Sequence, residues 1–242
     1  MLVSIIIPCF NEKEYIEEII KRTLGQNTIN KEIIIVDDGS TDGTTEILKN
    51  KIETKVRKII YLKKNVGKGN AIREAIKFVT GEIILIQDAD LEYNPTDYDK
   101  IILPFKINKA DVVYGSRFIS NDSRRVIYFL NTIANKILTF FLNCVLNLNF
   151  TDVETGYKAF KTEFIKKINV DEKGFGFEIE ITIKLAKIQA KFYEVGITYN
   201  GRTISEGKKI RMKHFFEAIY CIIKYKLFWM KLLFCKNLII KK

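Results

Sequence analysis

Short apolar runs alternate with amphipathic stretches along the first third of the chain. Four runs rich in β-branched residues predict buried strands at 2–8, 32–39, 59–62 and 83–86. The stretches between them carry apolar residues at helical spacing and predict helices at 14–24, 44–51 and 70–79. We expect Pro8 to end the first strand, because proline cannot donate to a central ladder. This alternation predicts an α/β domain with a mainly parallel sheet flanked by helices.

Polar residues follow three of the predicted strands directly. Asn11 and Glu12 come after the first strand, Asp37 and Asp38 end the second, and an acidic run at 88–92 follows the fourth. In open parallel sheets, ligands bind beyond the carboxyl ends of the strands. The sequence therefore predicts a polar binding site at one rim of the sheet.

The acidic run after the fourth strand reads Asp88, Ala89, Asp90, Leu91, Glu92. In an extended backbone alternate residues point to one side, so we expect the three carboxylates to converge. Such oxygen ligands suit Mg²⁺ or Mn²⁺, which commonly also takes substrate phosphates as ligands. A solvated acidic turn is the alternative and would be preferred for an isolated motif; the other polar motifs at the same rim favour the metal site.

Composition adds a basic C-terminal segment to this picture. The net charge of +11 is concentrated in residues 207–242, which hold ten Lys and Arg and one acid, Glu217. Such a segment suggests an anionic partner. The four cysteines show no metal or disulfide spacing, which favours a reduced, cytosolic setting, and we expect no signal peptide.

Two apolar segments predict contact with a membrane surface. Residues 215–234 are apolar with three interspersed lysines, a pattern typical of a helix that lies among lipid headgroups. Residues 126–150 could span a bilayer by length, but five asparagines argue against this. We interpret 126–150 as an interfacial helix or helix pair, with a buried core helix as the alternative, and we expect no transmembrane helix. No nucleic-acid motif is present, so nucleic acid is disfavoured.

Several motifs, taken in order, resemble family 2 glycosyltransferases with a GT-A fold. They are SIIIPCFNE (4–12), IIIVDDGSTDGT (33–44), NVGKGNAIREA (65–75), GEIILIQDADLE (81–92), VVYGSRF (112–118), TDVETGYKAF (151–160), GFGFEIEI (174–181) and EVGITYNGRTISEGKKI (194–210). The set is similar to the branch that contains dolichol- and polyprenyl-phosphate mannosyl- and glucosyltransferases. It implies a catalytic domain at 1–210, and the charge and apolar pattern of 211–242 predict a basic, amphipathic membrane-associating extension after it.

The resemblance also implies roles for individual residues. The nucleotide-sugar pocket would contain Pro8, Asn11, Glu12, Asp37, Asp38, Lys68, Asp88, Ala89 and Asp90. The metal ligands would be Asp88, Asp90 and Glu92, and the acceptor phosphate would meet Arg117, Arg202, Lys208 and Lys209. Asp88, Asp90, Arg117 and Arg202, with Glu180 as a candidate base, would carry the catalysis.

Simpler structural roles remain open for several of these residues. Asp37 and Asp38 could turn the chain and cap a helix, Lys68 could be a surface lysine, and Arg117 could form a structural ion pair. The loop around Lys68 matches neither a phosphate-binding P-loop nor the dinucleotide fingerprint. The basic loop that holds Arg202, Lys208 and Lys209 could simply be surface. His214, the single histidine, is expected at a surface or interface.

The sequence as a whole predicts an inverting, metal-dependent glycosyltransferase of cell-envelope glycan biosynthesis. It would transfer a sugar from a UDP- or GDP-linked donor to a polyprenyl (dolichyl or undecaprenyl) phosphate, peripherally at the cytoplasmic face of an anionic membrane. One alternative acceptor is a sugar hydroxyl of a glycolipid or polysaccharide, which would need Glu180 as base. A further alternative, of another class, is that the chain is a non-catalytic membrane-binding module, although this alternative predicts a broken D-x-D motif. Only Ala134 and Asn135 match the Ser-Arg/Lys-Gly-Ala-Asn run of mannosyl-transferring relatives, which argues against assigning mannose.

Overall fold

The computed structural model describes the chain except residues 108, 120–124, 127, 204, 208–213 and 227–242. Its strands are β1 (Val3–Cys9), β2 (Lys31–Asp37), β3 (Lys58–Tyr61), β4 (Ile83–Ile86), β5 (Val112–Ser116), β6 (Lys158–Lys161) and β7 (Phe192–Gly196). Its helices are α1 (Ile16–Gly25), α2 (Thr44–Ile47), α3 (Lys68–Ile76), α4 (Tyr98–Ile107), α5 (Phe129–Leu146), α6 (Thr162–Ile165) and α7 (Phe177–Lys187). A π-helical turn (Leu48–Ile52) and two 3₁₀ turns (Glu53–Lys55, Pro95–Asp97) complete the named elements, and residues 214–226 form a further helix.

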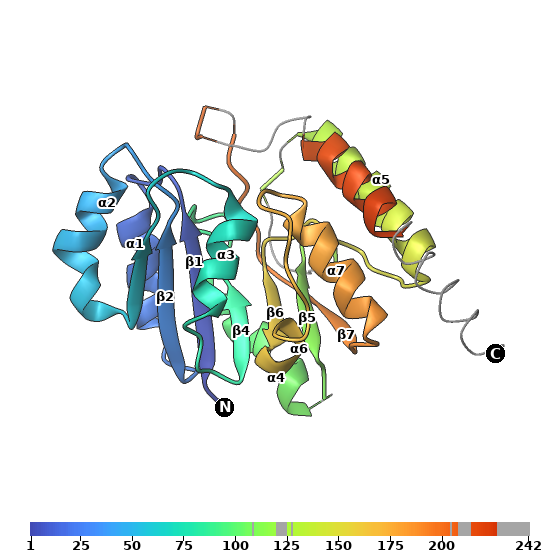
Figure 1. Cartoon of the computed structure of the whole chain (residues 1–242), viewed down its shortest axis with the longest axis horizontal. Coiled ribbons are helices and arrows are strands. Elements are labelled where there is room, and N and C mark those ends of the chain that lie inside the picture. The colour runs from blue at the N-terminus through green and yellow to red at the C-terminus, as the bar shows by residue number, and fades with distance from the viewer. Residues whose placement is uncertain (108, 120–124, 127, 204, 208–213, 227–242) are drawn as a thin grey trace, which may run out of the picture.

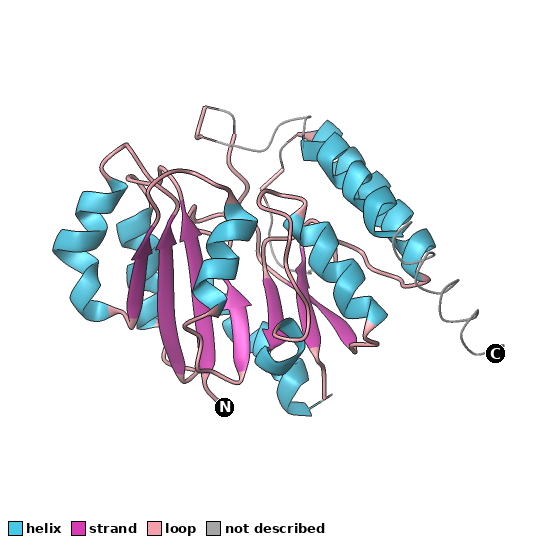
Figure 2. Ribbon diagram, viewed as in Figure 1, coloured by secondary structure: helices cyan, strands magenta, loops and turns pink. Residues whose placement is uncertain are grey.

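One seven-stranded sheet organises the described residues, in the order β3-β2-β1-β4-β6-β5-β7. The first four strands pair in parallel, β5 pairs in parallel with β7, and β6 is antiparallel to both of its neighbours. Helices lie on both faces of the sheet (Figures 1 and 2). The prediction of a mainly parallel α/β sheet is confirmed, with β6 as its antiparallel member.

The predicted end of the first strand is wrong by one residue. Pro8 pairs with Val36 inside β1, and the strand continues to Cys9. The backbone N–H and C=O groups of even-numbered residues in β1 point toward β4, since the Gln87 N–H donates to the Ile6 carbonyl 2.9 Å away. The β4 ladder ends at Ile86, so the missing N–H of Pro8 lies where β1 needs no donor.

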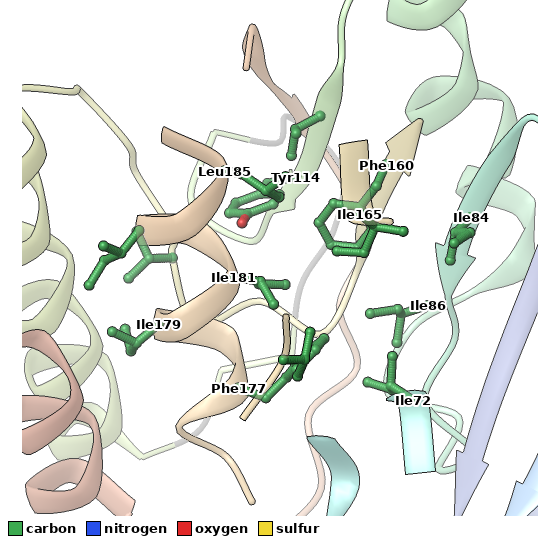
Figure 3. Packing of buried hydrophobic residues seen from close by; sticks show 14 of the residues in the cluster. Ile72, Ile84, Ile86, Tyr114, Phe160, Ile165, Phe177, Ile179, Ile181 and Leu185 are labelled. Carbon is green, nitrogen blue, oxygen red and sulfur yellow. The ribbon is translucent and has the colours of Figure 1, made fainter. Parts of the chain in front are cut away.

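The apolar residues of the strands divide between two cores, as alternation along a buried strand requires. Val3, Ile5 and Ile7 pack toward α1 and α4, whereas Ile6 packs toward α3 and α7. Figure 3 shows the second core, in which Ile84 and Ile86 of β4 and Tyr114 of β5 lie opposite the apolar side chains of α7. Since both faces are filled, polar ligands can approach only at the ends of the strands.

The apolar segment 126–150 contains α5, which has one buried side and one exposed side. Leu138 and Leu142 join the core, whereas Phe129, Leu130 and Phe140 are exposed. By length and composition, α5 is the one helix among the described residues that could cross a membrane. It therefore combines features of both expectations, the core helix and the interfacial helix.

The asparagines of this segment have structural tasks. Asn135 Nδ2 donates to Asp152 Oδ1 at 3.1 Å, and Asn143 exchanges two 2.8 Å hydrogen bonds with the backbone of Phe150. Asn147 ends α5 in a left-handed conformation, with φ of 53°. The side chains of Asn135 and Asn143 thus tie α5 to the chain that follows it.

The helix at 214–226 packs on the same core as α5. Ala218, Cys221, Ile222 and Tyr225 are buried there, and Glu172 accepts from Lys224 Nζ at 2.6 Å and from the Tyr225 hydroxyl at 2.9 Å. The ring of His214 lies 4.5 Å from that of Phe175. The rest of the predicted membrane-associating extension, residues 211–213 and 227–242, lies outside the described residues.

We predict that this docking protects Cys221 from alkylation. Cys221 is 2% exposed, and burial together with the nearby Glu172 carboxylate raises the pKa of its thiol to about 12. Cys144 on α5 is exposed. Iodoacetamide at pH 8, followed by peptide mass spectrometry, should label Cys144 much faster than Cys221, because the thiolate is the reactive species. Equal labelling rates would contradict the docked position of this helix.

Candidate active site

The polar loops predicted to share one rim do meet there. Asn11 and Glu12 follow β1, Asp37 and Asp38 lie at the end of β2, and the acidic run 88–92 follows β4. Two further segments reach this rim: residues 151–157, which lead into β6, and residues 197–203, which follow β7. The reversed direction of β6 is what brings its preceding loop to the carboxyl end of β4.

A guanidinium lies among three carboxylates at the centre of the rim. Arg202 Nη2 is 2.7 Å from Asp90 Oδ2, Nη1 is 3.2 Å from Glu12 Oε2, and Nε is 3.5 Å from Glu92 Oε1. The guanidinium also lies 5.3 Å from the centre of the Tyr15 ring. The structure thus places Arg202 at the D-x-D motif, and its contact with a phosphate stays a prediction.

This cluster carries more negative than positive charge. Burial raises the pKa of Asp90 to about 7, and the carboxylates of Glu92 and Asp88 add to this while Arg202 opposes it. Burial would lower the pKa of Arg202, but Asp90, Glu12 and Glu92 outweigh it and raise that pKa. A site that disfavours ionisation of its own carboxyl group is one that a further cation would stabilise.

The predicted convergence of Asp88, Asp90 and Glu92 is wrong. The backbone turns after Asp88, and Leu91 has φ of 61°, so the alternation of an extended strand is lost. Glu92 is held by the Arg202 backbone N–H at 2.9 Å and the Tyr199 hydroxyl at 2.8 Å. Within the described residues, no three His, Cys, Asp or Glu side chains form a group that could hold a metal ion by themselves.

Asp88 instead begins a chain of buried ion pairs. Lys68 Nζ lies 2.7 Å from Asp88 Oδ1 and 3.0 Å from Glu178 Oε1, and Lys158 Nζ lies 2.5 Å from Glu178 Oε2. Burial would lower the pKa of Lys68, yet the two carboxylates raise it above its ordinary value. Lys68 is therefore not the surface lysine of the alternative interpretation; its contact with a nucleotide stays a prediction.

Asp37 and Asp38 organise the loops beside the D-x-D motif. Asp37 Oδ1 accepts from the Ser40 N–H at 3.0 Å, and its other oxygen accepts from the Thr45 hydroxyl. Asp38 accepts from the backbone N–H groups of Val66 and Gly67, at 3.0 and 2.7 Å. Asp37 thus has the turn-forming role considered as the alternative, whereas Asp38 ties its own loop to the distant loop before α3. The predicted nucleotide contacts of Asp37, Asp38, Pro8 and Asn11 remain untested, and Ala89 is buried in the core.

Arg117 forms the structural ion pair that was the alternative to phosphate binding. Its Nε and Nη2 lie 2.6 and 2.7 Å from the two oxygens of fully buried Asp152, and the ring of Tyr199 covers its guanidinium. Asn135 donates to the same carboxylate. With both arms of its fork engaged, Arg117 fixes the 151–157 loop, and its contact with a phosphate stays a prediction.

The assignment of Glu180 as a base does not fit the structure. The residue is fully buried in α7, and its oxygens accept from the N–H groups of Asp171 and Glu172, both at 2.8 Å. Lys184 Nζ adds an ion pair at 2.6 Å. Glu180 anchors the loop before α7, and a carboxylate enclosed in this way cannot reach an acceptor hydroxyl. Lys208 and Lys209 lie outside the described residues.

Sequence reasoning missed Glu154, in the loop before β6. Its Oε1 atom is buried and has no hydrogen-bond partner among the described residues. Burial raises the pKa of Glu154 to about 7, with a contribution from Glu178, while Lys158 and Arg117 oppose the rise. The signal available in the sequence was a second acid two residues after Asp152, within a motif already assigned to the site.

Comparison with known proteins identifies the family of the chain. The model of glycosyl transferase family 2 matches residues 4–168. The chain belongs to glycosyl transferase family 2. It is accordingly a glycosyltransferase, and the interpretation as a non-catalytic module is disfavoured.

Curated relatives extend this similarity over most of the chain. Glycosyltransferase AglJ of Haloferax volcanii is 31% identical over 202 residues, which cover 83% of this chain and 63% of that protein. A dolichol-phosphate mannosyltransferase of Pyrococcus furiosus is 28% identical and covers 93% of this chain and 65% of its own length. An undecaprenyl-phosphate mannosyltransferase of Micrococcus luteus is 27% identical, with 86% and 87% covered. The chain thus spans slightly under two thirds of the first two of these relatives.

Two solved structures of sugar-transferring synthases show the same fold. Glucosyl-3-phosphoglycerate synthase from Mycobacterium tuberculosis, in complex with Mn²⁺, UDP and phosphoglyceric acid, aligns with a TM-score of 0.71 at 18% identity, covering 93% of this chain and 78% of that one. Mannosyl-3-phosphoglycerate synthase from Rubrobacter xylanophilus gives 0.71 at 18% identity, with 96% and 74% covered. The prediction of a GT-A fold is confirmed.

Proposed function

We propose that this family 2 enzyme transfers a sugar, with inversion, from a nucleoside-diphosphate sugar to a polyprenyl phosphate. The observation that carries the proposal is the excess of carboxylates at the carboxyl end of β4, where Asp90, Glu12 and Glu92 surround the guanidinium of Arg202. Burial, with the neighbouring carboxylates adding to it, raises the pKa of Asp90 to about 7. A nucleoside diphosphate bound with a divalent cation would balance this charge. The relatives named for dolichol-phosphate and undecaprenyl-phosphate mannosyl transfer support a lipid phosphate as acceptor.

A divalent cation fits the donor set of the rim. Asp88 and Asp90 would hold Mg²⁺ or Mn²⁺ together with the donor diphosphate, and the similar structure that contains Mn²⁺ and UDP supports this. Bound there, the metal would offset the charge that develops on the leaving diphosphate. Glu92 is committed to Arg202 and Tyr199, so we assign it to positioning Arg202 rather than to the metal.

Two of the chain's own residues would then act directly on the donor site. Arg202, already at Asp90, would bind a diphosphate oxygen through its planar fork. Lys68 would hold Asp88 in place. An acceptor phosphate is anionic and needs no strong base, which agrees with the enclosure of Glu180.

An acceptor comparison tests this function. Purified protein with Mn²⁺ would be given UDP-glucose, GDP-mannose and UDP-N-acetylglucosamine, each with undecaprenyl phosphate, undecaprenol or 3-phosphoglycerate. We expect transfer to undecaprenyl phosphate with one of the donors and none to undecaprenol. Transfer to undecaprenol would show that a hydroxyl is the acceptor, and transfer to 3-phosphoglycerate alone would remove the lipid from the proposal.

We also propose that the exposed apolar side of α5 rests on an anionic membrane, at the cytoplasmic face, where the lipid acceptor lies. Phe129 and Leu130 are 75% and 76% exposed, and Phe216, Tyr220 and Ile223 add exposed apolar side chains from the helix at 214–226. Apolar side chains inserted at the level of the headgroups, with basic residues beside them, are typical of interfacial helices.

Replacing Phe129 and Leu130 by Ser should weaken binding to vesicles of phosphatidylglycerol and phosphatidylcholine about tenfold or more, because two large apolar side chains leave the lipid. The matched control is Leu103→Ser with Ile107→Ser, also exposed apolar residues, on α4 at the opposite face of the sheet. Co-sedimentation measures both variants. Equal loss in the two would contradict a membrane contact specific to α5.

A further inference from the structure

We propose that Glu154 binds a hydroxyl group of the transferred sugar and so helps to determine which sugar the enzyme accepts. The inference rests on the proposed function and adds to it a residue that contacts the donor. It is carried by the position of its loop against Asp88, by an unpartnered oxygen on its side chain, and by the pairing of its cationic neighbours among the described residues, Lys158 and Arg117, with other acids.

The loop that carries Glu154 is pressed against Asp88. The Gly156 N–H donates to the Tyr93 hydroxyl at 2.8 Å, and a Cβ atom at Gly156 would clash with Asp88 Oδ2. Two residues before Glu154, Asp152 is locked by Arg117 and Asn135. The loop is therefore fixed on both sides of Glu154, next to the carboxylate that we assign to the donor diphosphate and its metal.

The cationic side chains around Glu154 that the structure describes are paired with other acids. Arg117 is paired with both oxygens of Asp152. Lys158 Nζ is fully buried and held by Glu178 at 2.5 Å and by the carbonyls of Val153 and Thr155 at 2.9 and 2.5 Å. Among the described residues, Glu154 thus forms no ion pair of its own, although Lys158 and Arg117 are close enough to lower its pKa.

What Oε1 of Glu154 lacks is a neutral donor. Buried polar atoms are almost always hydrogen-bonded, and an unpaired one lowers stability unless a ligand or water completes it. A diphosphate or lipid phosphate is anionic and would repel an ionised carboxylate. A sugar hydroxyl is uncharged and can both donate and accept, so it pairs with a carboxyl group in either protonation state. The burial that raises the pKa of Glu154 to about 7 is consistent with a neutral partner.

This role predicts a separation between the two parts of the donor. The nucleoside diphosphate should bind equally well to wild type and Glu154→Ala, whereas the nucleoside-diphosphate sugar should bind about tenfold more weakly to the variant, as expected for the loss of one hydrogen bond to a charged or buried carboxyl. Glu154→Gln retains an acceptor oxygen and should restore most of the sugar-dependent affinity. Glu163→Ala, an exposed acid on α6, is the matched control.

The experiment is calorimetric titration of the full chain with Mn²⁺ and, in turn, UDP, UDP-glucose, GDP, GDP-mannose and UDP-N-acetylglucosamine, with the unfolding free energy of each variant measured by urea. The expected result is lost sugar-dependent affinity without lost stability in Glu154→Ala. Equal weakening of diphosphate and diphosphate sugar, or unchanged affinities for both, whatever the unfolding free energy, would overturn the inference. If wild type binds none of the five nucleotides, the proposed function fails, and this inference with it.

Discussion

Asp90→Asn is expected to lower sugar transfer on the order of a thousandfold or more while leaving the protein folded. The substitution removes the carboxylate that faces Arg202 at 2.7 Å and that we assign to the metal, so both electrostatic partners of the donor diphosphate are affected at once. Initial rates of transfer to undecaprenyl phosphate measure the effect. A variant that keeps a tenth or more of the wild-type rate would contradict the role of Asp90.

Stability separates this loss from unfolding. In the metal-free protein the pKa of Asp90 is raised from 3.8 to about 7, so the folded state holds its proton more tightly than the unfolded state. The contribution of Asp90 to the unfolding free energy therefore falls as pH rises from about 4 to 7, and Asp90→Asn should remove this part of the slope. Glu17→Gln, in an exposed ion pair with Lys51, is the control and should change neither activity nor slope.

Arg117→Ala is expected to lower the free energy of unfolding by about 3–5 kcal/mol, because it leaves the fully buried Asp152 carboxylate without its counter-charge. Urea denaturation measures the change. Arg125→Ala is the matched control. Arg125 Nη1 lies 2.7 Å from Glu206 Oε2, but both of these side chains are exposed. Loss of this pair should lower the free energy of unfolding only slightly by comparison.

A double-mutant cycle identifies the cause of that loss. Combining Arg117→Ala with Asp152→Asn should cost clearly less than the sum of the two single changes, because the unpaired buried charge is then absent. If the losses of unfolding free energy in the two single variants simply add up in the double variant, the ion pair does not hold the 151–157 loop. The same follows if Arg117→Ala costs no more unfolding free energy than Arg125→Ala. Arg117 would then be available to a phosphate, as the family resemblance first implied.

The repeating pattern of the sequence was sufficient to predict the fold of the first half. Buried strands at 2–8 and 83–86 could be recognised because both faces of a parallel sheet are covered and the strands read as unbroken apolar runs. The position of Pro8 was misjudged because the end of the neighbouring strand β4, which removes the need for its N–H, is a tertiary fact. The antiparallel direction of β6 likewise depends on the path of the chain between β5 and β6.

The site was predictable in its location and less so in its contacts. Strand ends put Glu12, Asp38 and Asp88 on one rim, and this required only the alternation of strands and helices. Whether an acid is open or enclosed depends on partners far away in sequence. The carboxylate of Glu180 accepts hydrogen bonds from the backbone of residues 171 and 172, and Arg117 pairs with Asp152, 35 residues later in the chain. The local sequence pattern reveals neither contact.

The D-x-D motif illustrates the same limit within five residues. A turn with Leu91 in the left-handed region sends Asp88 toward Lys68 and Asp90 toward Arg202, so the two carboxylates serve different neighbours. Glu154 shows the reverse case, an acid with no local signature that becomes notable only because its neighbours have all been paired with other groups.

The most direct test of the account is the metal dependence of lipid-linked product formation. Wild-type protein would be incubated with undecaprenyl phosphate and each labelled nucleotide sugar in turn, with Mn²⁺ or with EDTA, and the label extracted into chloroform would be counted. We predict an acid-labile, chloroform-soluble product with one donor in Mn²⁺ and none in EDTA. Product formed equally well in EDTA, or donor hydrolysis in Mn²⁺ without any lipid-linked sugar, would contradict it.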